Sequence, residues 1–96
     1  MNDKSRIEID LQFFSEKDIE NQESGSLKRA IRKYHARIDE HRDKIQNPRK
    51  YISDWDSLDE KRQTGLIKHW NKEIRNFEQS ISDRIDELKK RGDYDE

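Results

Sequence analysis

Three histidines are the side chains best suited to acid–base or metal chemistry in this 96-residue chain, which has no cysteine. His69 and Glu73 stand four residues apart, so they share one face of a helix and could supply two ligands to a metal ion. His35 and His41 are six residues apart, on poorly matched helix faces, and no third ligand stands at a suitable spacing. We therefore expect a surface pair at His69 and Glu73, a hydrogen-bonded register histidine at His41, and no metal or cofactor.

Carboxylates are abundant, with 22 Asp and Glu residues, but no two of them stand out from the solvated helix faces as a general acid and base. Without cysteine there is no thiol nucleophile, and with three glycines there is no glycine-rich loop to hold a phosphate. The sequence therefore predicts a protein that is not an enzyme.

A basic stretch offers a different chemistry. Residues 27–50 carry nine basic and three acidic side chains, although the whole chain has a net charge of −1. Such a surface can bind the phosphates of a nucleic acid without sequence preference and in a salt-dependent way. The pI of about 6.3 argues against this function, because nucleic-acid-binding domains usually have a basic pI. Nucleic-acid binding is therefore the alternative hypothesis, with these candidate contacts: Lys28, Arg29, Arg32, Lys33 and Arg37.

The overall composition indicates a helical protein. Charged residues make up 45% of the chain and hydrophobic residues 28%, and no apolar stretch approaches the ~20 residues of a membrane span. The N-terminus has no apolar core of a secretory signal, and one proline with three glycines is too few for a chain of many β-turns. We expect a cytoplasmic protein without a membrane partner.

Two stretches with helical periodicity predict an all-α fold, an antiparallel helical hairpin. From Leu27 to Ile45, apolar residues recur in alternating steps of four and three, a heptad seam that predicts a helix at about 27–46. Ser26 is the expected N-cap, and Pro48 ends the helix because proline disfavours helical geometry in the residue before it. A second helix is expected at about 58–91.

The second helix has clear start and stop signals. Ser57 and Glu60 have the spacing of a capping box, and Gly92 follows a basic last turn, as glycine does at many helix ends. The expected organisation is a hairpin domain at 27–91 between an acidic N-terminal tail, 1–26, and an acidic C-terminal tail, 92–96. Residues 7–13 alternate apolar and polar residues but have no partner strand, so we expect the N-terminal tail to be extended or disordered, or to dock as a peptide.

The unequal helix lengths predict self-association. At ~1.5 Å per residue the second helix is about 50 Å long and the first about 30 Å, so the first would cover the second only to about Glu78. The N-terminal segment, a second copy of the chain in a dimeric four-helix bundle or coiled coil, or a larger partner protein would then cover the rest. The predicted contact stripe consists of Trp70, Ile74, Phe77, Ile81, Ile85 and Leu88. Two residues of the connection, Trp55 and Tyr51, flank it. For the connection itself there are two hypotheses: it plugs the end of the core, or it is a recognition loop that presents Trp55 to a partner.

Several segments resemble proteins of Gram-positive phages and prophages. Asp10-Leu11-Gln12-Phe13-Phe14-Ser15 resembles the "DLQFF" leader of capsid, scaffold and minor head proteins. The stretches at 47–51, 55–56 and 68–74 are similar to a small helical segment from the same prophage neighbourhoods. The resemblance implies a phage or mobile-element origin and a structural, assembly or inhibitor role through protein–protein contact. Together with the self-association predicted above, it gives as expected partner a second copy or a larger phage or host protein, in the host cytoplasm or on the virion.

Overall fold

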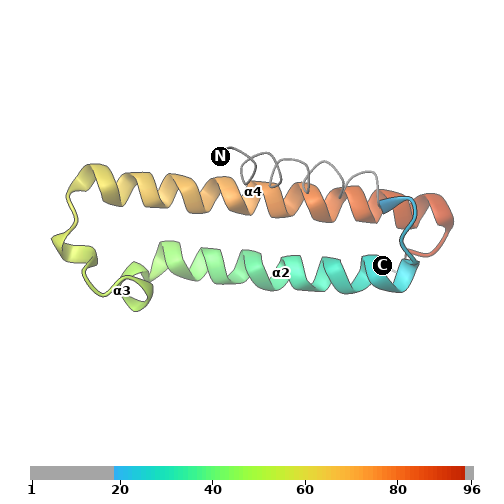
Figure 1. Cartoon of the computed structure of the whole chain (residues 1–96), viewed down its shortest axis with the longest axis horizontal. Helices are drawn as coiled ribbons and strands as arrows, with labels where there is room; N and C mark the ends of the chain where they lie inside the picture. Colours follow the sequence, from blue (N-terminus) through green and yellow to red (C-terminus); the bar gives the residue numbers. More distant parts are fainter. Residues whose placement is uncertain (1–18, 95–96) are drawn as a thin grey trace, which may run out of the picture.

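The structure, a computed structural model, describes residues 19–94 and shows two long antiparallel helices side by side (Figure 1). Helix α2 spans Ser24–Gln46 and helix α4 spans Glu60–Arg91. The connection holds a short helix, α3 (Pro48–Tyr51), and a 3-10 turn, η1 (Trp55–Ser57). The all-α hairpin predicted from the sequence is therefore confirmed, whereas the expectations for residues 1–18 lie outside the described residues.

Helix α2 begins three residues before the expected start, so the prediction that Ser26 is its N-cap is wrong. The N-cap is Glu23, whose side chain makes no capping hydrogen bond. Ser26 lies inside the first turn, where its Oγ accepts from Arg29 Nη2 at 3.1 Å. Ser24 Oγ instead donates to Asp93 Oδ2 at 2.5 Å, so the first turn of α2 is tied to the residues that follow α4.

The ends of α4 show why one expected cap is present and another is not. Asp59 is the N-cap, since its Oδ1 accepts from the backbone N–H of Arg62 at 2.8 Å; the cap expected at Ser57 is wrong because Ser57 belongs to η1. At the other end Gly92 has φ 77°, and its N–H donates to the carbonyls of Leu88 and Lys89. A side chain at this left-handed position would be strained, which explains the glycine.

The core extends along the whole length of α2. At the open end of the hairpin, Ile19, Leu27 and Leu88 form one buried cluster. Further along, Ile38 of α2 packs with two isoleucines of α4, Ile74 and Ile81. The expectation that residues 81–88 lack an intramolecular partner is therefore wrong, because α2 begins opposite the end of α4.

The surplus length of α4 lies at its beginning, where the connection covers it. Trp55 of η1 stacks on Trp70 with ring centroids 6.1 Å apart and planes 22° from parallel. Gln63 Nε2 donates to the Trp55 carbonyl at 2.8 Å and holds η1 against α4. The connection therefore packs against the start of α4, and α2 pairs with the part of α4 that follows.

Candidate interaction surface

The apolar stripe predicted as a contact surface forms the core of the hairpin itself. Of the eight residues predicted for this contact surface, five are at most 8% exposed: Trp55, Trp70, Ile74, Ile81 and Leu88. Phe77 and Ile85 are half-buried against the same core, and Tyr51 is 37% exposed. The fold therefore leaves only the edges of these last three side chains for a partner, and Trp55 plugs the core instead of presenting itself on a recognition loop.

Two different surfaces flank this core. His41 follows the buried Ile38 by three residues and Arg42 follows it by four, so at roughly 100° per residue they fall on opposite sides of Ile38. Tyr34 and His35, one heptad earlier, are separated in the same way. The hairpin consequently has one flank that contains Tyr34 and His41 and another that contains His35 and Arg42.

We call the first surface the closed flank, because its side chains pack on one another; it consists of Tyr34, His41, Glu73, Phe77 and Arg84. Phe77 lies between the two α2 residues, with its ring centroid 5.8 Å from that of Tyr34 and 5.3 Å from that of His41. The contact with His41 is edge-on, a favourable geometry for two aromatic rings. Aromatic packing therefore joins α2 to α4 along this flank.

His41 is the polar centre of the closed flank and is 5% exposed. Its Nδ1 lies 2.9 Å from the Arg37 carbonyl, which can only accept, so Nδ1 carries a hydrogen. Its Nε2 lies 2.7 Å from Glu73 Oε1, within hydrogen-bond distance. The contact joins α2 to α4 and confirms that His41 is a hydrogen-bonded histidine. Its role in specifying the register of the two helices stays a prediction.

Glu73 also faces the histidine that shares its helix face. His69 Nε2 lies 3.5 Å from Glu73 Oε2, which is the pair expected from the sequence, and the His69 side chain is 60% exposed. The sequence did not reveal that both histidines reach one carboxylate, because that depends on the register of α2 against α4. The described residues contain no group of three or more His, Cys, Asp or Glu that could hold a metal ion.

Arg84 extends the closed flank toward the open end. Its guanidinium lies over the Tyr34 ring at 5.0 Å, and its Nη1 donates to the Ser80 carbonyl at 3.0 Å. The residue is 4% exposed, and its buried Nε finds no hydrogen-bond partner among the described residues. A buried arginine stacked on tyrosine thus fills this part of the flank.

The opposite surface, the open flank, has two hollows between the helices. The hollow near the connection has a volume of about 470 Å³ and is lined by Arg42, Ile45, Gln46, Asn71, Ile74, Arg75 and Glu78. The hollow near the open end has a volume of about 250 Å³ and is lined by Lys28, Ile31, Arg32, His35, Ile85, Leu88 and Tyr94. The α2 residues 28, 32, 35, 42 and 46 are separated by steps of three, four and seven, so they share one helix face.

Basic side chains surround the apolar floors of both hollows. In the first hollow the floor is Ile45 and Ile74, and Arg42 reaches across to Glu78, with Nη2 and Oε2 3.7 Å apart. Both partners of this ion pair are more than half exposed, so it contributes little to stability and can rearrange. The described lining of the second hollow contains no acidic residue.

The candidate nucleic-acid contacts are spread around the solvent side of α2. Arg29, Arg32, Lys33 and Arg37 are exposed, and Lys28 is partly buried. Arg29 and Lys33 lie two residues before and after Ile31, roughly 200° around the helix from the core. Of the five candidates, Lys28 and Arg32 line the hollow near the open end.

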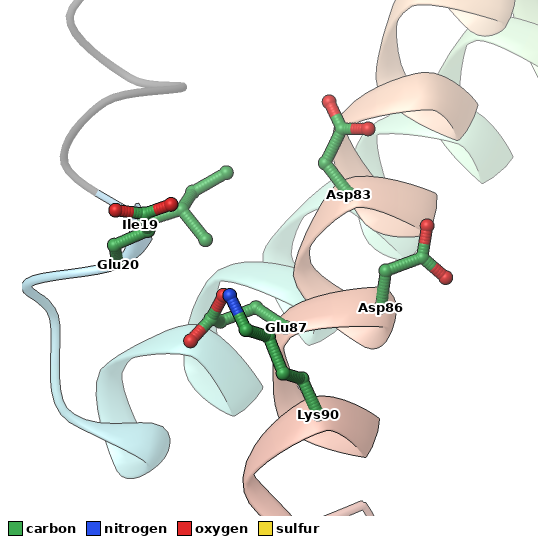
Figure 2. A pocket seen from close by; sticks show the side chains of 6 residues that line it. All are labelled: Ile19, Glu20, Asp83, Asp86, Glu87 and Lys90. Atoms are coloured by element: carbon green, nitrogen blue, oxygen red, sulfur yellow. The ribbon is translucent and has the colours of Figure 1, made fainter.

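Near its C-terminal end, the outer face of α4 is acidic. A third hollow, beside the residues that lead into α2, is lined by Ile19, Glu20, Asp83, Asp86, Glu87 and Lys90 (Figure 2). Arg91 fastens the chain here, because its Nη2 donates to the carbonyls of Ile19 and Glu20 at 2.9 and 3.2 Å. The open end of the hairpin therefore has a basic hollow on one surface and an acidic hollow on another.

Exposed ionic contacts order the connection. Asp43 accepts from Lys50 Nζ at 2.8 Å, from Tyr51 Oη at 2.6 Å and from Asn47 Nδ2 at 2.8 Å. These hydrogen bonds, with that of Lys50 the strongest, lower the pKa of Asp43 from 3.8 to about 2. The guanidinium of Arg49 lowers the pKa of Asp56 in the same way. Both pairs stabilise the short α3 turn and give the connection a fixed shape.

Comparisons with known proteins identify no relative: no family model, curated protein or solved structure matches this chain. Within the described part, neither long helix is apolar enough to cross a membrane.

Proposed function

We propose that this chain is a non-enzymatic protein–protein interaction module that binds its partner along the open flank. The observation that carries the proposal is the pair of hollows between α2 and α4, each with an apolar floor and basic side chains around it. Protein-binding surfaces commonly combine an apolar centre with a polar rim in which arginine is enriched. On the closed flank, by contrast, His41 and the Nη1 of Arg84 make their hydrogen bonds within the chain.

The proposed biological setting is a phage or prophage of Gram-positive bacteria, with a structural, assembly or inhibitor role in the host cytoplasm or on the virion. It depends on the "DLQFF" leader at residues 10–14 and on the similar segments of the helical body. A second copy of the chain and a larger phage or host protein are both partners that fit this setting.

Charge reversals on the open flank test the proposal. Immobilised wild-type protein is compared with Arg75→Glu and with Arg37→Glu, which reverses an exposed charge on the solvent side of α2. We expect wild type and Arg37→Glu to retain one defined partner from a lysate of the phage-bearing host, identified by mass spectrometry. Arg75→Glu is expected to lose it at least tenfold. Equal retention by all three proteins would exclude the open flank as the binding surface.

Nucleic-acid binding is the second candidate, favoured by the exposure of Arg29, Arg32 and Lys33 on a stretch, 27–38, without an acidic residue. Since Arg29 and Lys33 lie away from the hollows, the double variant Arg29→Gln, Lys33→Gln separates the two functions. This function predicts a band shift at low salt that weakens steeply with added salt and weakens further in the double variant. No shift at low salt would reject it.

A further inference from the structure

We propose that the hollow at the open end binds the N-terminal segment of a second copy, residues 7–16, so that two chains exchange these segments. We call this hollow, lined as given above, the end hollow. The inference rests on the proposed function, because it names the partner of one part of the open flank.

An occupant complementary to the end hollow would be both apolar and acidic. Ile31, Ile85 and Tyr94 provide the apolar surface above the buried Leu88, and the volume of about 250 Å³ admits a bulky side chain. Arg32 of α2 lines it together with His35, and no described lining residue is acidic. An apolar side chain flanked by carboxylates would therefore match both the floor and the charge of the hollow.

The segment 7–16 has this chemistry in its sequence. Residues 7–13 alternate four apolar side chains with Glu8, Asp10 and Gln12, and Phe14 and Glu16 follow. No basic residue occurs between positions 7 and 16. The segment thus carries bulky apolar groups with acidic neighbours on both sides.

The charge of the outer face of α4 favours a second copy over the same chain. The backbone carbonyl of Ile19 accepts a hydrogen bond from Arg91 Nη2. Ile19 lines the same hollow as Asp83 and Asp86 (Figure 2). To reach its own end hollow by way of the outer face of α4, the acidic segment would have to cross these carboxylates, and like charges repel. The hollow of a second copy can be approached without that crossing.

An exchange of this kind forms a closed, symmetric dimer. Each chain provides one segment and one hollow, so the two contacts are equivalent, as a two-fold axis requires. No part of the buried hairpin core has to open, because the hollow already lies between the packed helices.

The test reverses one charge on each side of the proposed contact in the full-length chain. Arg32→Glu changes the end hollow, Asp10→Arg changes the segment, and Lys33→Glu is the control, an exposed residue of α2 outside the hollow. Sedimentation velocity across a concentration series gives the mass of each species, and circular dichroism shows that each variant is folded. We expect wild type and Lys33→Glu to dimerise with the same Kd, and each of the other two variants to dimerise at least tenfold more weakly.

Mixing the two reversed variants identifies the exchange. In the mixed pair one contact has the wild-type charges and the other has both charges reversed, so we expect the mixture to dimerise more tightly than either variant alone. A monomeric wild-type chain would overturn the proposal, as would a mixture no tighter than its components or a Lys33→Glu variant weakened as much as Arg32→Glu. None of these results would affect the proposed function, whose test scores a foreign partner and uses Arg75→Glu.

Discussion

The closed and open flanks of the hairpin differ in how their polar side chains are satisfied. On the closed flank, His41 and Arg84 are buried, and their partners are a carboxylate, two backbone carbonyls and an aromatic ring of the same chain. On the open flank, the ion pair of Arg42 and Glu78 is solvated and the spaces beside it are hollow. The closed flank fixes how the two helices pair, and this leaves the open flank available for binding.

The difference arises from which residues stand beside the core row of α2. Tyr34 and His41 are rings that can pack on Phe77, so the closed side is filled. Arg32 and Arg42 have long side chains that keep their charge in water, so the apolar floor between the helices is only rimmed and not covered. A small hairpin can thus use one side for its own stability and the other for a partner.

The largest expected effect comes from two truncations one helical turn apart on α4. Leu88 is fully buried, so Leu88→Ala should lower the free energy of unfolding by about 3 kcal/mol. Ile85 is half-buried and lines the end hollow, so Ile85→Ala should cost about 1 kcal/mol. Urea titration followed by circular dichroism measures both losses. Equal losses would mean that the open flank is covered as fully as the core.

Double-mutant cycles on the two inter-helix ion pairs sharpen the comparison. The pair His41–Glu73 has one nearly buried partner and a 2.7 Å contact, so its coupling free energy should be about 1 kcal/mol after allowance for the partly exposed glutamate. The pair Arg42–Glu78 should give less than about 0.5 kcal/mol. The cycles combine His41→Ala with Glu73→Ala, and Arg42→Ala with Glu78→Ala, under the same urea titration. A stronger coupling on the open flank would reverse the assignment of the two surfaces.

The sequence was sufficient to predict the two helices, their antiparallel pairing, the glycine at the end of α4 and the inward position of His41. These features depend on local signals: the spacing of apolar residues, a proline, a glycine and a basic last turn. The start of α2 was placed three residues late because Ser24 is held by Asp93, 69 positions away. No local pattern contains that contact.

The register of α2 against α4 was the main feature that the sequence did not determine. Each helix has a long apolar row, so the two rows can be aligned at several offsets on the sequence alone. In the structure, Trp55 stacks on Trp70 and holds the connection over the start of α4. For the same reason, the convergence of His41 and His69 on Glu73 and the position of the two hollows became evident only from the structure.

The smallest expected effect concerns Asp43, the next residue after Arg42, at the connection end of the hairpin. Three donors hold its carboxylate, and its folded pKa of about 2 is below the ordinary value of 3.8. A lowered pKa means that the folded state favours the ionised form, so this contribution is complete above about pH 4 and is lost as the pH falls through about 2.

Tyr51→Phe removes one donor, and we expect the pKa of Asp43 to rise part of the way toward 3.8 with no measurable change in the stability of the hairpin at neutral pH. A carboxyl NMR titration of wild type and Tyr51→Phe measures the shift, with Tyr94→Phe, at the other end of the hairpin, as the control. If the pKa of Asp43 were unchanged in Tyr51→Phe, the tyrosine hydroxyl would not bind this carboxylate in solution, and the connection would be held by its lysine and asparagine alone.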